Sequence, residues 1–526
     1  MPQERHDQTG VSGSQIDRRT VLKTAATAAA VAAGGAGVSG SAGARSTASI
    51  SFERTTIESF DGTELGATLY VPPERGPRPS VLMTHGWGAF RQGPITVPKA
   101  TEYAKNGYTV LTYDSRGFSS SEGTVGLNGP NETRDAQRMI DFLANETGQF
   151  GVDVALDGPD NPRVGMDGIS YAGGIQFQVA AADDRLDAMV PRITWNDLEY
   201  SLAPGGVVKS GWLTALLGLG EINTLFDDDA DVTDNLSRWY EQSIENNEVP
   251  DEAIEAFRSR SVAYEDGIDT PTLLMQGWTD SLFNPTEALD TYRQLQESGT
   301  ESRLLFYEGG HDLTELTVDF SDRGRMNDHA VRWMDQHVRG GATDVPQVSN
   351  YLPQRDRWRE DAQFPPADTT TEIYELADGG EGSSAELEQG WGWWTDEAVT
   401  YQWTAEEDIE LIGEPTIDLT VDVAGPEARL FFELFHDGDN INGMDQPILV
   451  DSSGRHDLRV QYPAIQEFVS EGDSIELEIS VTNPWYLDSR ESEGATIDAT
   501  NSRLHLPQRP DENAPEAEDD DCWLFC

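Results

Sequence analysis

Between Ser49 and about Gly340, short apolar runs rich in β-branched residues alternate with longer stretches of helical periodicity. This alternation is typical of a mostly parallel sheet whose strands are joined by crossover helices. We expect strands at residues 65–71, 80–84, 109–113, 163–166, 188–193, 272–276 and 303–307, and helices at 97–105, 132–145, 171–182, 286–297 and 328–338. The order of these segments predicts a doubly wound α/β domain over residues 49–345.

Two further regions have a different pattern. Residues 197–269 interrupt the alternation and contain helical segments at 212–219, 236–246 and 251–264, so we expect a helical cap over the strand ends. Residues 367–508 consist of short alternating runs, among them 416–421, 428–435, 458–460 and 475–481. Such runs predict an all-β sandwich as a second domain, which suits a chain of 526 residues.

The composition is strongly acidic, with 94 acidic and 36 basic residues, a formal charge of −58 and only four lysines. A surface of this charge repels phosphate groups, so we exclude nucleic acid and anionic lipid as partners. Self-repulsion weakens a compact fold in dilute buffer, whereas molar salt shortens the screening length to about 3 Å. The composition therefore predicts a protein adapted to high salt.

Residues 1–44 have the features of an export signal. The pair Arg18 and Arg19 precedes a weakly apolar, alanine-rich stretch at 25–38, and Ala42-Gly43-Ala44 fits a cleavage site of small residues. The pattern resembles a twin-arginine signal, with an amphipathic or disordered N-terminus as the alternative. No later run approaches the roughly 20 apolar residues of a membrane span. We expect a soluble, secreted product that meets the twin-arginine export machinery and does not insert into membranes.

The only cysteines, Cys522 and Cys526, lie in the acidic segment 509–526, which we expect to be a disordered tail. Two such ligands do not make a zinc site, and either a local disulfide or two free thiols would suit them. We expect neither a metal nor an organic cofactor.

Ser170 is the candidate nucleophile. It lies in the segment M-D-G-I-S-Y-A-G-G, directly after an expected strand and before an expected helix. A nucleophile elbow needs this context, because a tight strand-to-helix turn has strained backbone angles and leaves room only for small neighbours. Gly168, Ala172 and Gly173 are small, although Ala172 departs from the strict G-x-S-x-G pattern.

A serine hydroxyl needs a base, and histidine has a suitable pKa near neutrality. His311 follows the last expected strand in the turn E-G-G-H-D, from which it could reach the same strand ends as Ser170. The carboxylate that orients the imidazole is assigned to Asp280, after the strand at 272–276, with Asp312 as the competing residue. The resulting chain order of serine, aspartate and histidine is that of α/β-hydrolases.

The oxyanion formed during attack needs donors, usually two backbone N–H groups. Tyr171, directly after the nucleophile, would supply one, and Trp87 in the turn T-H-G-W-G would supply the other. We expect His85 of that turn to brace the loop. Trp212 and Trp278 are candidate residues of the substrate pocket, with a position in the core as the alternative for both.

Several segments resemble the X-Pro dipeptidyl-peptidase and cocaine esterase family of hydrolases: G-I-S-Y-A-G, the stretch D-S-R-G-F-S-S-S-E-G, P-R-I-T-W-N-D-L, G-W-T-D, G-G-H and D-I-E-L-I-G-E-P-T. The resemblance extends over about residues 51–506. It implies an α/β-hydrolase domain, a helical cap and a C-terminal jelly roll, with the nucleophile at Ser170, the acid at Asp280 and the base at His311. Relatives similar to the esterase have a tyrosine where this chain has Trp87, so the indole or the backbone N–H would replace its hydroxyl.

The resemblance implies a mechanism more firmly than a substrate. We expect a hydrolase that cleaves ester or peptide bonds through an acyl-enzyme, in the first place a dipeptidyl-peptidase acting on short X-Pro peptides. An acyl esterase or acylase acting on small esters is the alternative, and an inactive hydrolase attached to a carbohydrate- or surface-binding β-domain is a third reading. A peptidase needs a carboxylate for the free amino terminus of its substrate, and the abundant acidic residues do not single one out.

Overall fold

The computed structural model describes residues 49–224, 230–232, 234–265, 267–311, 320–342, 345–380, 385–387, 398–490 and 494–511. All of them belong to one compact unit, Arg45–Cys526. The expected signal at 1–44, the competing acid Asp312 and both cysteines lie outside the described residues. In the part of the chain that is described, no helix is both long and apolar enough to span a membrane.

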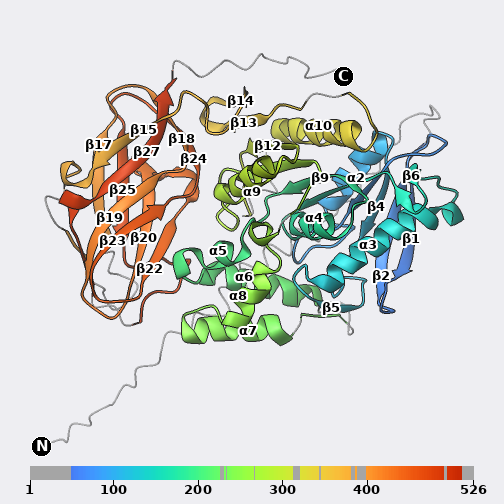
Figure 1. Cartoon of the computed structure of the whole chain (residues 1–526), viewed down its shortest axis with the longest axis horizontal. Coiled ribbons are helices and arrows are strands. Elements are labelled where there is room, and N and C mark those ends of the chain that lie inside the picture. The colour runs from blue at the N-terminus through green and yellow to red at the C-terminus, as the bar shows by residue number, and fades with distance from the viewer. Residues whose placement is uncertain are drawn as a thin grey trace, which may run out of the picture. The chain divides into compact units, whose positions relative to one another are not determined.

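A ten-stranded sheet forms the centre of the first domain, with the strand order β1-β2-β4-β3-β8-β9-β11-β12-β13-β14 (Figure 1). Its strands are β1 (Ser51–Glu58), β2 (Glu64–Val71), β3 (Ser80–Met83), β4 (Thr109–Tyr113), β8 (Val164–Ile169), β9 (Leu186–Arg192), β11 (Thr272–Gly277), β12 (Ser302–Tyr307), β13 (Val348–Leu352) and β14 (Arg357–Asp361). The strands from β4 to β13 pair in parallel, while β1, β2 and β14 add antiparallel edges. The mostly parallel sheet predicted from the alternation is therefore confirmed.

Helices cover both faces of this sheet, as a doubly wound fold requires. The covering helices are α2 (Thr96–Lys105), α3 (Pro130–Asn145), α4 (Tyr171–Ala182), α9 (Pro285–Ser298) and α10 (Phe320–His337). Apolar side chains of α3, α4 and α9 share one buried cluster with the sheet, and those of α2 and α10 share another. Because the parallel strands all end at the same edge, the loops after β3, β8, β11 and β12 meet there.

The sheet continues past residue 345, where the sequence placed the end of the domain. Strand β13 pairs in parallel with β12, and β14 pairs with β13. Both strands carry polar residues, V-S-N-Y-L and R-W-R-E-D, so neither has the apolar pattern that indicates a buried strand. β13 and β14 belong to the sheet because their backbones pair with neighbouring strands, and the sequence does not reveal this pairing.

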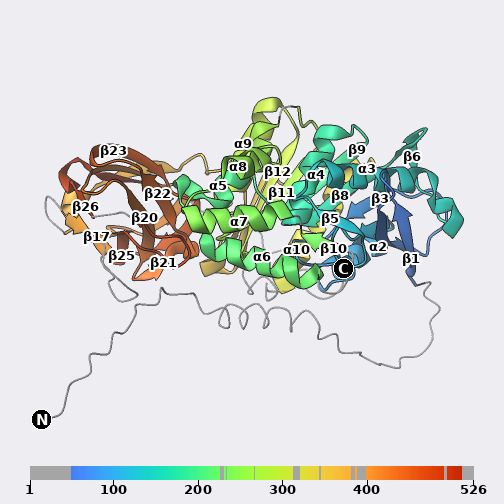
Figure 2. The ribbon, with the colours of Figure 1, turned by 90° about the horizontal axis from the view of Figure 1, so that it is seen from below.

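The cap lies between β9 and β11 and contains α5 (Leu198–Leu202), α6 (Ser210–Thr224), α7 (Asp234–Asn246) and α8 (Asp251–Arg258). Helices α6 and α7 lie side by side (Figure 2). Strand β10 (Ala230–Val232) pairs in parallel with β5 (Gly123–Val125) and so ties the cap to the first domain. The helix expected over 251–264 ends at Arg258, and a separate 3₁₀ turn follows at Val262–Tyr264.

The second domain consists of two antiparallel sheets. The larger sheet contains β15 (Thr370–Glu375), β16 (Ala385–Leu387), β18 (Ile409–Gly413), β19 (Thr416–Val423), β23 (Gly454–Gln461), β24 (Ile465–Val469), β26 (Ala495–Ile497) and β27 (Arg503–Pro510). The smaller contains β17 (Ala398–Thr404), β20 (Ala428–His436), β21 (Asp439–Asn440), β22 (Gln446–Val450) and β25 (Ser474–Ser480). Both contribute to one apolar core, so the predicted all-β domain is found, while its jelly-roll connectivity stays a prediction.

Candidate active site

Ser170 occupies the sharp turn between β8 and α4. Its backbone angles are φ 58° and ψ −118°, a conformation that non-glycine residues rarely adopt and that is found at strained functional sites. A Cβ on Gly168 would lie 2.5 Å from the carbonyl oxygen of Ala172, and one on Gly173 would lie 2.8 Å from Cβ of Thr194. The turn therefore requires both glycines, whereas its remaining small position accepts alanine.

A buried ion pair between β8 and β9 supports this turn. The Arg192 guanidinium donates to the Asp167 carboxylate at 2.8 and 2.7 Å, and the Tyr103 hydroxyl donates to the same carboxylate at 2.7 Å. Burial by itself would raise the pKa of Asp167, but the charge and hydrogen bonds of Arg192 hold it below its usual value. The carbonyl oxygen of Arg192 also accepts the N–H of Ser170 at 2.8 Å. These residues were not singled out in the sequence, because only the pairing of β8 with β9 brings them together.

His311 and Asp280 meet at the same edge of the sheet. His311 follows β12, Asp280 follows β11, and His311 Nδ1 lies 2.7 Å from Asp280 Oδ2. A Cβ on Gly310 would lie 2.7 Å from Cα of Asp280, so the two loops pass closely and only glycine fits there. Asp280 is fully buried, and its Oδ1 accepts the N–H groups of Leu282 and Phe283 at 3.0 and 2.9 Å.

The second ring nitrogen of His311 remains available for proton transfer. With Nδ1–H bonded to Asp280, Nε2 is the acceptor nitrogen, and it is buried without a hydrogen-bond partner among the described residues. No hydrogen bond joins it to Ser170 in this part of the chain. Such catalytic hydrogen bonds are often long in the absence of substrate and tighten when it binds.

Two aromatic rings hold the imidazole of His311 in place. The rings of Phe283 and Trp212 stand edge-on to it, with centroids 5.0 and 6.2 Å away, and Trp212 Nε1 donates to the Ser281 hydroxyl at 3.2 Å. Trp212 therefore lies beside the candidate base.

Trp278 does not lie at the site. Its ring is 1% exposed and stacks on Phe306 with centroids 4.1 Å apart, and its Nε1 donates to Asn350 Oδ1 at 3.0 Å. The assignment of Trp278 to the pocket is thus wrong, and the core position is correct. The sequence left both positions open for Trp278, because a tryptophan that lines a pocket and one that packs in the core look the same in a sequence.

The loop after β3 lies against Ser170. A Cβ on Gly86 would be 3.8 Å from Ser170 Cβ. His85 braces this loop: it is fully buried, its Nδ1–H donates to the Gly86 carbonyl oxygen at 2.9 Å, and its Nε2 accepts the Ser115 N–H at 3.1 Å. Burial lowers the pKa of His85 and so favours the neutral ring that these two bonds require.

The side chain of Trp87 is hydrogen-bonded to the cap. Its Nε1 donates to the Leu216 carbonyl oxygen of α6 at 2.7 Å, and its ring packs against Tyr171 with centroids 5.4 Å apart. The indole N–H therefore points to the cap, which leaves the backbone N–H as the group that Trp87 can offer to an oxyanion. Tyr171 is held at both ends by Asn128, whose N–H donates to the Tyr171 hydroxyl at 3.1 Å and whose Nδ2 donates to the Tyr171 carbonyl oxygen at 2.7 Å.

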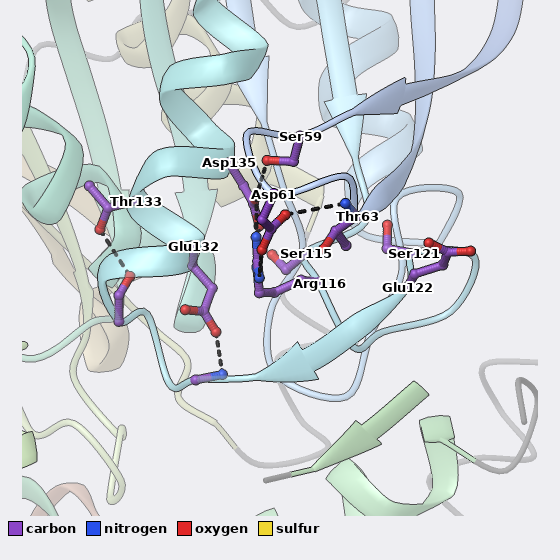
Figure 3. Close-up of polar contacts among 12 residues, drawn as sticks. Ser59, Asp61, Thr63, Ser115, Arg116, Ser121, Glu122, Glu132, Thr133 and Asp135 are labelled. Atoms are coloured by element: carbon purple, nitrogen blue, oxygen red, sulfur yellow. Dashed lines mark hydrogen bonds and ion pairs between the residues drawn. The ribbon is translucent and has the colours of Figure 1, made fainter. Parts of the chain in front are cut away.

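Figure 3 shows a polar cluster in which Arg116, Glu132 and Asp135 take part. Arg116 donates to both oxygens of Asp135 at 2.6 and 2.7 Å and to Asp61 at 3.1 Å. Glu132 accepts the N–H of Gly126, and burial raises the pKa of Glu132 to about 7. The cluster thus fixes both ends of the segment from β5 to α3.

A cavity of about 100 Å³ opens beside Ser170, between the first domain and the cap. The first domain contributes Trp87, Leu127, Tyr171 and Trp195, and the cap contributes leucines of α5, α6 and α7 together with Trp239, Val249 and Phe257. Trp212 and Trp278 do not belong to this lining. No aspartate or glutamate lines the cavity within the described ranges. The wall is therefore apolar on nearly every side, and its hydroxyl groups belong to Ser170, Tyr171, Tyr240 and Ser243.

Comparisons with known proteins agree with this fold. The chain matches the family model described as X-Pro dipeptidyl-peptidase (S15 family) over residues 61–312. It is 26% identical to cocaine esterase of Rhodococcus sp. in an alignment 442 residues long that covers 74% of this chain and 70% of the relative.

Solved structures share the fold at lower identity. A CocE/NonD family hydrolase from Staphylococcus aureus superposes with a TM-score of 0.67 at 16% identity, covering 87% of this chain and 94% of that one. An α-amino acid ester hydrolase superposes with a TM-score of 0.63 at 15% identity, covering 90% and 98%. The segment matched by the family model contains Trp87, Ser170, Asp280 and His311. Together, these matches support a serine hydrolase of the X-Pro dipeptidyl-peptidase and cocaine esterase type.

Proposed function

We propose that the chain is an acyl esterase or acylase that uses Ser170, His311 and Asp280 to hydrolyse substrates with an apolar acyl group. The observation that carries this proposal is the apolar cavity directly beside Ser170. The expectation of a dipeptidyl-peptidase becomes the second candidate.

The proposed catalytic steps use His311 Nε2 as the base and the Ser170 hydroxyl oxygen as the nucleophile. His311 Nε2 takes the proton of the Ser170 hydroxyl as its oxygen attacks the substrate carbonyl carbon, and Nδ1–H keeps its bond to Asp280. The backbone N–H groups of Tyr171 and Trp87 donate to the oxyanion. The imidazolium then protonates the leaving alcohol or amine, which leaves an acyl-Ser170 ester. Water, deprotonated by the same nitrogen, releases the acid and restores the serine.

The lining of the cavity favours an apolar acyl group over an X-Pro dipeptide. A dipeptidyl-peptidase binds the charged amino terminus of its substrate, and an ammonium group moved into an apolar cavity loses its hydration without gaining a partner. The described lining offers aromatic and aliphatic side chains and no carboxylate. Burial of a fatty or aromatic acyl chain there would instead be favourable, at about 25 cal/mol per Å².

Hydrolysis of matched substrates tests the proposal. The protein purified in high salt is given nitrophenyl esters of short and medium acyl chains and an X-Pro anilide with a free or a blocked amino end. We expect ester turnover that Ser170→Ala abolishes, and negligible anilide turnover. Efficient cleavage of the anilide that depends on its free amino end would overturn the acyl assignment and favour the peptidase.

We also propose that residues 1–44 direct twin-arginine export. The support is the pair Arg18 and Arg19 before an alanine-rich stretch. Replacing both arginines by lysine should retain the protein inside the producing cell, as measured by immunoblot of cells and medium. Unchanged secretion of this variant would refute the assignment.

Adaptation to high salt is a separate proposal that rests on the charge of −58. Transfer from molar to millimolar salt should lower the melting temperature, because the acidic groups then repel one another over longer distances. A melting temperature that is independent of salt would contradict it.

A further inference from the structure

Lys209 is a buried lysine next to the loop of the candidate acid. It lies in the cap directly before α6 and is 4% exposed, and its Nζ donates to the Ser281 carbonyl oxygen at 2.9 Å and to that of Leu282 at 3.4 Å. No carboxylate oxygen of the described residues lies within ion-pair distance of this ammonium group. A charge placed here is therefore directed at two peptide carbonyls rather than at a salt-bridge partner.

The same two peptide groups face the carboxylate of Asp280 on their other side. The peptide that begins at the Ser281 carbonyl ends at the N–H of Leu282, and the one that begins at the Leu282 carbonyl ends at the N–H of Phe283. Both N–H groups donate to Asp280 Oδ1, at 3.0 and 2.9 Å. Each peptide is thus bonded to an ammonium at its oxygen and to a carboxylate at its hydrogen.

Hydrogen bonds connected in this way strengthen one another, because a cation at the carbonyl oxygen makes the N–H of the same peptide a better donor. The low polarity of a buried site enlarges the effect. The remaining oxygen of Asp280 is the one bonded to His311 Nδ1. The chain of contacts therefore runs from Lys209 through two peptide groups to the carboxylate, and from there to the imidazole.

We infer that Lys209 is a positioning residue of the hydrolase, which orients the Asp280 carboxylate toward His311 through the Ser281–Leu282 and Leu282–Phe283 peptide groups. The inference rests on the proposed function, since it assigns a role within the same Ser170–His311–Asp280 site.

The surroundings of Lys209 are compatible with a charged ammonium. Burial lowers the pKa of Lys209, while the carboxylates of Asp445, Glu287 and Asp280 act in the opposite direction. Asp445 belongs to the β-domain, and the ring of Tyr486 from the same domain has its centroid 6.0 Å from Nζ. The β-domain thereby contributes to the electrostatic environment of Lys209.

Lys209→Met tests the inference, with turnover of a nitrophenyl ester measured across pH. We expect kcat to fall by about 10- to 100-fold with little change in KM. This is the range found when a residue that orients a metal-binding side chain is removed. The acidic limb of kcat/KM should move to higher pH, because loss of a nearby positive charge makes the imidazolium of His311 easier to form. Lys105→Met is the matched control: Lys105 is exposed on α2 and bonded to Glu102, so its loss should change neither value.

A double mutant separates positioning from a general structural role. In an Asp280→Asn background the carboxylate no longer exists, so adding Lys209→Met should cause little further loss of kcat. The same fold loss in both backgrounds, or an acidic limb that does not move, would overturn the inference. If Lys209→Met does not yield folded protein, Lys209→Gln, which keeps a donor but no charge, replaces it in the same measurements. Loss of activity in Ser170→Ala and Asp280→Asn without any effect at Lys209 would refute this inference alone, whereas full activity of those two variants would refute the proposed function.

Discussion

The two sides of Ser170 differ in polarity. On one side stand His311, Asp280 and the loop that Lys209 holds, where Asp280 accepts three hydrogen bonds and His311 Nε2 has no partner among the described residues. On the other side lies a cavity whose described wall is aromatic and aliphatic and carries no carboxylate. In the function we propose, this difference separates two tasks: the polar side moves protons, and the apolar side selects the acyl group.

Removing the carboxylate of Asp280 should have the largest effect on kcat, because the polar side depends on this group to orient His311. Asp280→Asn is expected to lower kcat by about 10⁴-fold, since the amide favours the wrong tautomer of His311 and cannot stabilise the imidazolium. Steady-state ester hydrolysis measures this loss. Asp251→Asn, at an exposed position in α8, is the matched control and should retain full activity. Equal activity of the two variants would mean that Asp280 is not the catalytic acid.

Filling the cavity should have a smaller effect that depends on the substrate. Leu213 lines the cavity from α6, and Leu213→Trp should reduce kcat/KM for medium-chain esters by roughly 10- to 100-fold relative to acetyl esters, because the longer acyl group loses its space. Leu156→Trp, at an exposed leucine, should leave the ratio of the two substrates unchanged. Uniform loss for all acyl lengths would argue against the cavity as the acyl site.

The smallest expected effect is on the pH dependence of the free energy of unfolding. Burial raises the pKa of Glu132 from 4.5 to about 7, so its stabilising contribution is complete below pH 4.5 and is lost as the pH rises through about 7. Glu132→Gln cannot ionise and should be more stable than the parent at pH 8, by of the order of 1 to 3 kcal/mol, but not at pH 4. Thermal unfolding in high salt at both pH values provides the measurement. The exposed Glu122→Gln should show no such difference, and parallel pH profiles for parent and Glu132→Gln would contradict the account.

The polar side of the site was predictable in part because its signals are local. Ser170 stands between a strand and a helix with glycines on both sides, and His311 and Asp280 each follow an apolar strand. Parallel strands carry such positions to one edge of the sheet, so sequence order was enough to group them. The residues that support these loops were not predictable, because Lys209 and Asn128 are ordinary loop residues until long-range contacts bring them to the Ser281 carbonyl oxygen and to Tyr171.

The apolar side could not be predicted from its own residues. The helical periodicity of the cap indicated helices α6, α7 and α8, but a leucine or tryptophan facing a cavity and one facing the core look the same in a sequence. Trp278 shows this plainly, since it was a candidate for the pocket and its ring lies in the core. Strand β1 was missed for a related reason, because most of its side chains are exposed and give no apolar pattern.

Covalent labelling by a nitrophenyl alkylphosphonate of medium chain length tests the central claim most directly, because the reagent needs both the activated hydroxyl and the acyl cavity. Mass spectrometry of the digested protein should find the phosphonyl group on Ser170, with labelling that is slowed strongly by Asp280→Asn and modestly by Leu213→Trp. A fully active protein that carries the label on another residue, or carries none, would contradict the account.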